Sequence, residues 1–362
     1  MNMANRKTNL ELFRIIMMLA IIAHHLVGNS GVMELFKYDN ITGNMIFLQF
    51  FGFAGKAMIN GFILITGYFM IKQNFSLNKI IKLYLEIKFY KFLVYVFLSL
   101  LGFQDMGIKA LLKSVFNIIY EFNVGFTGTF FVLYLIIPFV NKFIMCLNQK
   151  LYLYLMCIFL FFFTIAPTFM FSETFCEIGW YIIMYMIGAY IRLFPNKFFE
   201  SKKYSGISSI IFLVTSYLSI LSIDFFNKYF NKSISPYHFV INANKVLALV
   251  LAVSVFCYFK NINIKYSKFL NTIAMTTFGV LLIHANSYSM RNFLWYKLLN
   301  ISGLYGKALL PIYAIMDVLL IYIVCVLIDL LRIYLLEKPL FNALMSLKSY
   351  KKLCKIVDDF LN

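Results

Sequence analysis

Long apolar runs alternate with short polar connections along this chain. A helix needs about 20 residues to cross the hydrocarbon core of a bilayer, so runs of this length predict membrane-spanning helices. Strands are not expected, because the runs do not alternate in polarity and backbone groups in lipid require helices or a closed barrel. The pattern predicts ten helical segments, at 9–30, 44–71, 83–103, 126–146, 151–171, 178–195, 207–224, 239–259, 269–290 and 308–335.

The composition agrees with a membrane protein and excludes several other classes. Hydrophobic residues make up 62% of the 362 positions and charged residues only 13%, about half of the share in soluble proteins. A soluble fold of this length cannot bury so much apolar surface, because its own surface must be largely polar. A soluble enzyme, a disordered chain and a nucleic-acid-binding domain are therefore excluded, and an all-α, polytopic membrane protein remains.

The distribution of the positive charge predicts the orientation in the membrane. The net charge of +18 comes from 33 Lys and Arg against 15 Asp and Glu. With the N-terminus in the cytoplasm, the inner loops and both termini hold 21 Lys and Arg. The outer loops hold eight, namely Lys37, Lys109, Lys113, Lys228, Lys232, Arg291, Lys297 and Lys307. Because cytoplasmic loops are enriched in Lys and Arg, we expect both termini to be cytoplasmic (N-in, C-in).

Two stretches outside the ten segments differ from the rest. Residues 105–122 are weakly amphipathic and are expected to lie on the outer membrane surface. Residues 341–362 are basic and amphipathic, and we expect a cytoplasmic tail on the inner leaflet that follows a single transmembrane domain at residues 1–340. The six cysteines are scattered without a CxxC spacing, so neither a disulfide framework nor a metal site is expected.

Ionisable residues within apolar segments are costly in lipid and are therefore candidates for function. Arg14 and His25 are eleven residues apart, or three helical turns plus about 20°, so they share one face of the first helix about 16 Å apart. Glu11 lies one turn before Arg14 and is placed to pair with it. The other residues of this kind are His24, Lys56, Glu86, Lys91, Lys245, His284, Asp317 and Asp329.

His284 lies near the end of the ninth apolar segment, at a depth in the predicted membrane similar to that of His25. Two imidazoles at one depth would suit proton transfer. The chain has no G-x-S-x-G, Walker or H-E-x-x-H motif, so nucleophile-elbow hydrolases, NTPases and zinc proteases lack support. The polar residues thus favour histidine acid–base chemistry.

These residues, taken in order, resemble acyltransferase family 3, the integral membrane acyltransferases that modify bacterial surface polysaccharides. The sequence Asn9-Leu10-Glu11-Leu12-Phe13-Arg14, followed after ten residues by His25, is similar to the R-X10-H signature of the family's first helix. Further similar segments follow in the same order, at Gly55–Phe69, Leu133–Lys142, Met184–Arg192, Phe278–His284 and Leu336–Pro339. The resemblance covers about residues 9 to 340, nearly the whole chain.

The resemblance implies about ten spans, a cytoplasmic acyl-CoA donor, and transfer of the acyl group to a sugar hydroxyl at or beyond the membrane. Acetyl-CoA is the donor that the family leads us to expect, without a metal. The resemblance also implies that Arg14 and His25 are required. We expect Glu11 to hold Arg14 against the donor and His25 to act as general base on the acceptor hydroxyl or on an intermediate carrier.

Basic residues after the second span are implied by the resemblance to hold the phosphates of CoA. This chain has Lys72, Lys79 and Lys82 there, where an arginine pair is common in the family. Lysine meets phosphate as a point charge and not as a bidentate fork. Residues assigned to acceptor or acyl binding are His284, Tyr134, Thr66 and Lys56.

Three departures from the family pattern bear on the choice of acyl group and acceptor. Thr66 replaces the usual serine and keeps a hydroxyl. Gly125 stands where relatives often have tryptophan, so an aromatic wall is not expected there. Ala285 follows His284 where an acid is common, so His284 lacks that partner.

Two other functions agree with the apolar pattern. A polysaccharide flippase or polymerase would also have about ten spans and act on lipid-linked glycans. An acyl-group channel would hand acyl units to a separate transferase. Neither predicts the ordered R-X10-H, late histidine and Glu-Lys-Pro set, which favours the acyltransferase. The expected partners are acyl-CoA, a capsular or undecaprenyl-linked glycan and the lipid bilayer, at a bacterial cell membrane.

Overall fold

The computed structural model describes residues 7–105, 107–109, 111–112, 125–170 and 176–362. The described residues form helices and connecting loops and contain no strand, which confirms the predicted all-α fold. The amphipathic stretch predicted at 105–122 falls mostly outside the described residues. Arg6 and Lys113, which are included in the count of Lys and Arg used to predict the orientation, also lie outside them.

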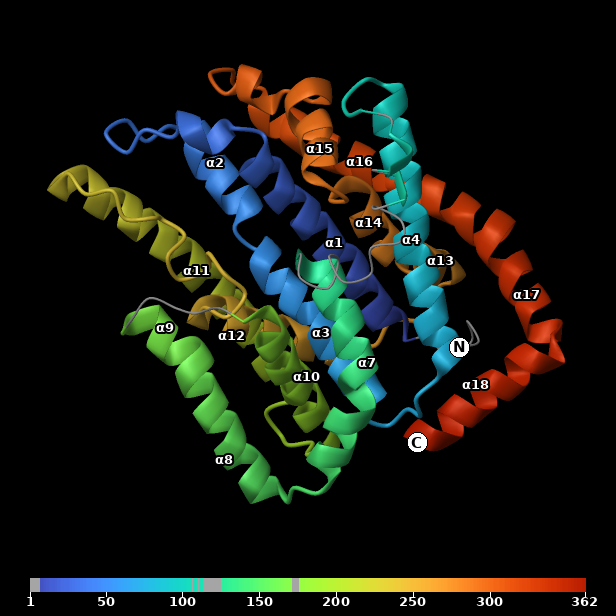
Figure 1. Ribbon diagram of the computed structural model, residues 1–362. Helices are drawn as coiled ribbons and strands as arrows, with labels where there is room; N and C mark the ends of the chain where they lie inside the picture. Colours follow the sequence, from blue (N-terminus) through green and yellow to red (C-terminus); the bar gives the residue numbers. More distant parts are fainter. Residues whose placement is uncertain (1–6, 106, 110, 113–124, 171–175) are drawn as a thin grey trace.

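Each of the ten predicted segments contains helix (Figure 1), although the one predicted at 239–259 begins with loop residues and becomes helical only at Val246. The first part of the chain forms α1 (Thr8–Asn29), α2 (Gly43–Gly52), α3 (Gly55–Met70), α4 (Leu77–Leu100) and α7 (Gly125–Met145). The middle forms α8 (Gln149–Leu160), α9 (Ala166–Phe169), α10 (Glu177–Leu193), α11 (Lys202–Phe230) and α12 (Val246–Asn261). The last part forms α13 (Lys268–Ala274), α14 (Thr277–His284), α15 (Tyr288–Asn292), α16 (Leu310–Arg332), α17 (Lys338–Ser346) and α18 (Lys348–Leu361).

Fewer helices meet the length and composition expected of a membrane span than the ten predicted apolar segments. Among the described residues, six helices are long and apolar enough to cross a membrane, or seven if a bent pair counts as one span. The helices α10 and α12 have only 17 and 16 residues, and α4 carries several charges along its length. The structure thus supports a polytopic membrane protein, while the count of ten and the N-in, C-in orientation stay predictions.

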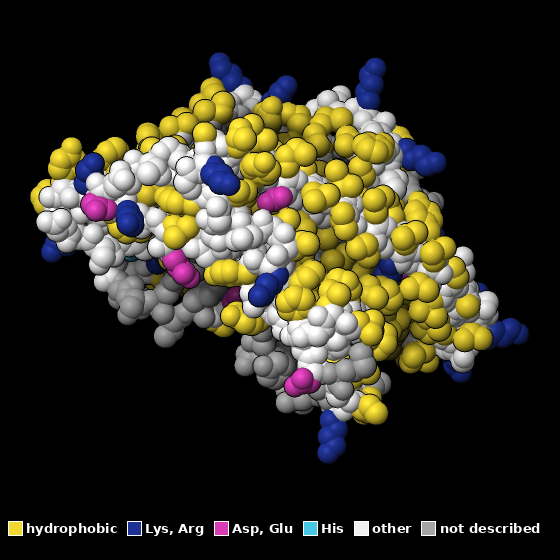
Figure 2. Space-filling view, turned by 90° about the horizontal axis from the view of Figure 1, so that it is seen from above, with side chains coloured by type: hydrophobic (Ala, Val, Ile, Leu, Met, Phe, Trp, Pro, Cys, Tyr) yellow, Lys and Arg dark blue, Asp and Glu magenta, His cyan; other side chains and the backbone are white. Residues whose placement is uncertain are grey.

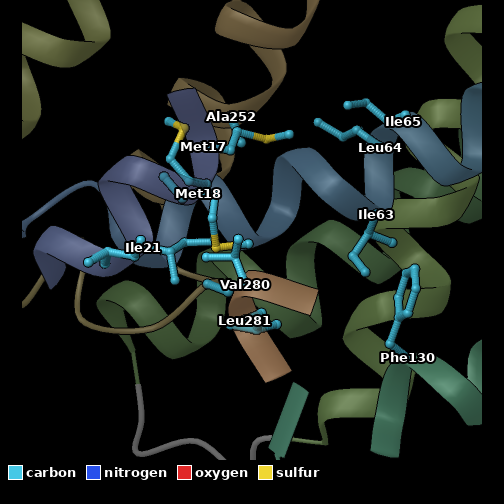
Figure 3. Packing of buried hydrophobic residues seen from close by; sticks show 14 of the residues in the cluster. Met17, Met18, Ile21, Ile63, Leu64, Ile65, Phe130, Ala252, Val280 and Leu281 are labelled. Carbon is cyan, nitrogen blue, oxygen red and sulfur yellow. The ribbon is translucent and has the colours of Figure 1, made fainter. Parts of the chain in front are cut away.

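The first helix lies inside the bundle. It packs against α2, α3, α12, α13, α14 and α16, and its buried residues run around its whole circumference. Figure 3 shows Met17 and Met18 leaving α1 in different directions, with Met18 beside Val280 of α14. Consecutive helical residues differ by 100°, so one apolar stretch can contact several neighbouring helices. The face that carries Arg14 and His25 is held in place from most sides.

Two glycines allow α3 and α10 to pack with their backbones in contact. A Cβ atom on Gly67 would collide with the carbonyl oxygen of Tyr185, and one on Gly188 would collide with the carbonyl oxygen of Leu64. Small residues let membrane helices approach closely, where van der Waals packing is the main source of association. This contact fixes α3, one wall of the cavity described below.

Large apolar side chains cover much of the outer surface. On α11 alone Ile207, Ile210, Ile211, Val214 and Leu218 are exposed. Figure 2 shows one face with broad apolar areas in which Lys and Arg side chains are scattered singly. A soluble monomer rarely exposes apolar patches of this extent. The surface is suited to contact with lipid tails.

The C-terminal residues form two helices, α17 and α18. Helix α18 packs against the start of α4, where Asp358 Oδ1 accepts a hydrogen bond from the backbone N–H of Leu77 at 2.6 Å. The hydroxyl of Tyr350 donates to Asn78 Oδ1 at 2.7 Å. The first N–H groups of a helix lack partners within it, so the Asp358 carboxylate caps α4. Contact of this basic helix with the inner leaflet stays a prediction.

Candidate functional site

A cavity of about 520 Å³ lies between α1, α3, α4, α7, α14 and α15. On α1 it is lined by Arg14, Met18, Ile21 and His25. These residues are spaced by four, three and four positions, which places them in one stripe along the helix. The face shared by Arg14 and His25, predicted from their spacing, is therefore the face that opens into the cavity.

Arg14 and His25 are eleven residues apart on α1, which corresponds to about 16 Å along the helix axis. They therefore lie at two different ends of the cavity. The Arg14 end contains Arg14, Thr66 and Tyr134. The histidine end contains His25 together with Ala285, Asn286 and Arg291. The rest of the lining is largely aromatic and aliphatic, and includes Tyr84, Phe126, Phe130, Phe131, Phe278, Leu281 and Leu282. An apolar pocket with a few polar groups at defined places is typical of a small-molecule site.

The structure brings His25 and His284 into direct contact. Nδ1 of His25 lies 3.0 Å from Nε2 of His284, and the ring centroids are 5.2 Å apart. His284 is fully buried, and its Nδ1 lies 2.7 Å from the backbone carbonyl oxygen of Val280. The prediction that the two imidazoles lie at one depth agrees with this geometry.

These contacts determine which ring nitrogens carry protons when both rings are neutral. A carbonyl oxygen can only accept, so Nδ1 of His284 is protonated and donates to Val280. Nε2 of His284 then has a lone pair and accepts from the Nδ1–H group of His25. His25 is left with its lone pair on Nε2, which has no hydrogen-bond partner among the residues that the structure describes. This atom is suited to accept a proton.

The adjacent His24 has a different environment and does not line the cavity. Its Nδ1 lies 2.9 Å from the carbonyl oxygen of Gly52. Gly55 lies so close that a Cβ atom added to it would collide with the His24 side chain. The His24 side chain thus packs against the break between α2 and α3. Of the two neighbouring histidines, only His25 faces the cavity.

The Arg14 end agrees with the predicted pairing of Arg14 and Glu11. Nη1 of Arg14 lies 3.6 Å from Glu11 Oε2, and the Glu11 side chain is buried. Thr66 also lines the cavity, and its hydroxyl donates to the Phe62 carbonyl of its own helix at 2.8 Å. Tyr134 lines the cavity and packs on Phe130, with ring centroids 5.0 Å apart.

Four lysines predicted for the site do not line the cavity. Lys72 and Lys79 are exposed, and Lys79 donates to Gln73 Oε1 at 3.2 Å. Lys82 is half exposed, and its Nζ lies 2.5 Å from Glu337 Oε1. Lys56 is partly buried on α3. A donor bound in the cavity could reach the exposed lysines only with a part that extends outside it.

A buried charge network connects the wall of the cavity to the C-terminal part of the chain. Arg332 donates to Asp329 Oδ1 at 2.7 Å, to Glu337 Oε2 at 2.7 Å and to Glu86 Oε1 at 2.9 Å. Glu86 also lines the cavity. The hydroxyl of Tyr90 donates to Asp329 Oδ1 at 2.5 Å. The Glu-Lys-Pro segment thus supplies Glu337, which links Arg332 and Lys82 and holds α4 against α16.

Sequence reasoning missed three polar residues of the histidine end. The sequence identifies Lys91 only as an ionisable residue within an apolar segment and predicts Arg291 in an outer loop, and Asn286 has no predicted role. The helix pair Lys268–His284 and Tyr288–Leu304 is bent by 94°, and this bend places Arg291 in the cavity wall. The one indication in the sequence is that Asn286 and Arg291 follow His284 by only two and seven residues, so both lie near it along the chain.

Comparison with known proteins gives a result that agrees with this geometry. The sequence profile of a family described as an acyltransferase domain matches residues 7–330. The match begins just before α1 and ends within α16, so it includes every helix that lines the cavity. No curated protein and no solved structure matches the chain.

Proposed function

Because the chain belongs to the acyltransferase family whose profile matches residues 7–330, we propose that it transfers an acyl group from acyl-CoA to a sugar hydroxyl. It is a multi-pass membrane acyltransferase by its family and its apolar helices. The observation that carries the finer proposal is the contact of His25 with His284 at one end of a cavity whose other end contains Arg14.

In the proposed reaction, His25 is the general base. Its Nε2 lone pair takes the proton of the acceptor hydroxyl as the hydroxyl oxygen attacks the carbonyl carbon of the thioester. The tetrahedral intermediate collapses with cleavage of the carbon–sulfur bond. The proton on His25 then passes to the leaving CoA thiolate, so that an ester and free CoA are formed and His25 returns to its neutral state.

His284 is proposed as a positioning residue. Its Nε2 accepts from Nδ1–H of His25, which holds the His25 ring and keeps the lone pair on the atom that must act as base. The bond from His284 to Val280 in turn fixes the tautomer of His284. In many histidine sites a carboxylate accepts the hydrogen bond from one ring N–H and fixes the tautomer. Here the Val280 carbonyl oxygen takes this role, so His284 does not need an acidic residue at position 285.

Arg14 is proposed to contact the donor. Its guanidinium lies at the opposite end of the cavity from His25, and Glu11 holds it by an ion pair. Thr66 and Tyr134 line the same end and offer hydroxyl groups to the acyl or pantetheine part. The exposed Lys72 and Lys79 are proposed to meet the phosphates of CoA outside the cavity. Acetyl-CoA is the simplest donor.

The acceptor is proposed to be a capsular or lipid-linked glycan at a bacterial cell membrane, with the donor entering from the cytoplasm. The experiment that tests this function combines two measurements. The purified protein is incubated with acetyl-CoA and membrane glycan, and release of free CoA thiol is followed. Mass spectrometry compares the surface glycan of cells with and without the gene, where acyl groups should be lost with the gene.

His25→Ala and His24→Ala form a matched pair for the same assay. His25→Ala should lower CoA release by about 10²–10⁴-fold, whereas His24→Ala should retain most of the activity, because His24 does not line the cavity. Undiminished glycan acylation by a normally inserted His25→Ala protein would overturn the assignment. Glycan transport without CoA release would favour a carrier.

A further inference from the structure

Arg291 is a cation in the wall of the cavity that the proposed reaction does not use. It lies on α15, lines the histidine end and is only partly buried. Its Nη1 donates to the carbonyl of Ala285 at 3.4 Å. No carboxylate of the described residues forms an ion pair with Arg291. The other nitrogens of the guanidinium remain available to a ligand.

The contact with Ala285 fixes the place of Arg291 relative to the histidines. Ala285 directly follows His284 and also lines the cavity. The bend after α14 folds α15 back, so that Arg291, His284 and His25 belong to one end of the cavity. A second cation, Lys91, lines this end and donates to the Asn286 carbonyl at 3.3 Å. The end where the hydroxyl must be activated is therefore lined by cations.

No carboxylate in the described lining of the cavity meets Arg291. Glu86 is the one carboxylate in the described lining, and it is bonded to Arg332 at 2.9 Å. Arg14 is at the far end, with Glu11 as its partner. A guanidinium in a largely apolar cavity is costly unless an anion meets it, and its planar fork matches carboxylate or phosphate oxygens.

We propose that the acceptor carries an anionic group next to the hydroxyl that is acylated, and that Arg291 binds this group. The inference rests on the proposed function, because it assigns the acceptor to the histidine end. The anion can be the carboxylate of an acidic sugar or the phosphate of a lipid-linked sugar. In both cases Arg291 orients the acceptor so that its hydroxyl meets Nε2 of His25.

The test measures binding to purified full-length protein in lipid nanodiscs, without turnover. Three probes are titrated at equal ionic strength, namely glucuronate, inorganic pyrophosphate and neutral glucose. One of the two anions should bind at least about ten times more tightly than glucose, as expected for a charge-assisted pair. Preference for glucuronate would identify an acidic sugar, and preference for pyrophosphate a lipid-linked phosphate.

Variants determine whether Arg291 is responsible. Arg291→Gln should abolish the preference for the anion, and Arg291→Lys should keep part of it, because it retains the charge without the fork. Lys297→Gln removes one exposed positive charge from the following helical turn and should change nothing. If the preference survives Arg291→Gln, or if glucose binds as tightly as both anions, the proposal is wrong.

A parallel titration with CoA separates this proposal from the proposed function. Arg291→Gln should leave CoA binding unchanged, and an equal loss of CoA affinity would make Arg291 a donor residue and overturn the inference. Absence of CoA release with acetyl-CoA and glycan would instead contradict the acyltransferase reaction, whatever the anion titrations give.

Discussion

Nδ1 of His25 lies 3.0 Å from Nε2 of His284, although 259 positions separate the two residues in the chain. If His284 holds the His25 ring by accepting this hydrogen bond, the activity of variants should depend on whether an acceptor remains. His284→Ala should lower kcat, whereas His284→Gln should retain more activity, because its amide oxygen can accept from Nδ1–H of His25. CoA release by proteins of equal thermal stability is the measurement.

The same series distinguishes positioning from packing. A purely structural His284 would make both variants lose thermal stability and activity together. Equal activity of the Ala and Gln variants at equal stability would contradict the positioning role. The double variant His25→Ala/His284→Ala should be no less active than His25→Ala alone, because two residues that act as one unit are not additive.

The Arg332 network should contribute strongly to stability. Arg332→Met leaves Asp329, Glu86 and Glu337 without the cation that they share, and removal of one partner from a buried network costs about 3–5 kcal/mol. Lys260→Met breaks an ion pair with Glu200 at 2.6 Å, but the Glu200 side chain is half exposed and can be hydrated. Thermal unfolding in detergent should show a clearly larger loss for Arg332→Met.

The lysines proposed for CoA binding should separate into two groups. Lys72→Glu combined with Lys79→Glu should weaken CoA binding at low salt and leave folding intact, because both side chains are exposed. Lys82→Glu should instead lower the unfolding temperature, since it places a third carboxylate beside Glu337 and Glu86. CoA titrations at two salt concentrations test this. Unchanged affinity of the Lys72/Lys79 variant would exclude that patch.

Gly188 and Gly28 should respond differently to substitution by alanine. Gly188→Ala forces a Cβ atom against the Leu64 carbonyl, and overpacking of this kind costs about 1–3 kcal/mol. Gly28 is an exposed helical residue of α1 with open space around its Cβ position, so Gly28→Ala should be neutral or slightly stabilising. Thermal unfolding compares them, and an equal effect would contradict the close contact of α3 with α10.

The orientation can be measured directly with reporter fusions. Green fluorescent protein joined after Asn362 should fluoresce, and alkaline phosphatase joined there should be inactive, if the C-terminus is cytoplasmic. Alkaline phosphatase inserted after Lys232, in the loop that follows α11, should be active outside. The opposite pattern would reverse the predicted orientation and would place the histidine end toward the cytoplasm.

The sequence by itself determined the fold class and one face of the site. The long apolar runs left no alternative to helices in lipid, and the eleven-residue spacing placed Arg14 and His25 on one side of α1, because helical geometry is local. The ordered motifs also led to the acyltransferase family, which the profile match over residues 7–330 bears out.

Only the tertiary structure decided which distant residues meet. The contact of His25 with His284, the return of Arg291 into the cavity by a bend, and the pairing of Lys82 with Glu337 depend on how separate helices pack. Each helix has several faces of similar hydropathy, so the pattern along the chain does not specify which faces join. That choice depends on close contacts such as those of Gly67 and Gly188, and it converts scattered polar residues into one site.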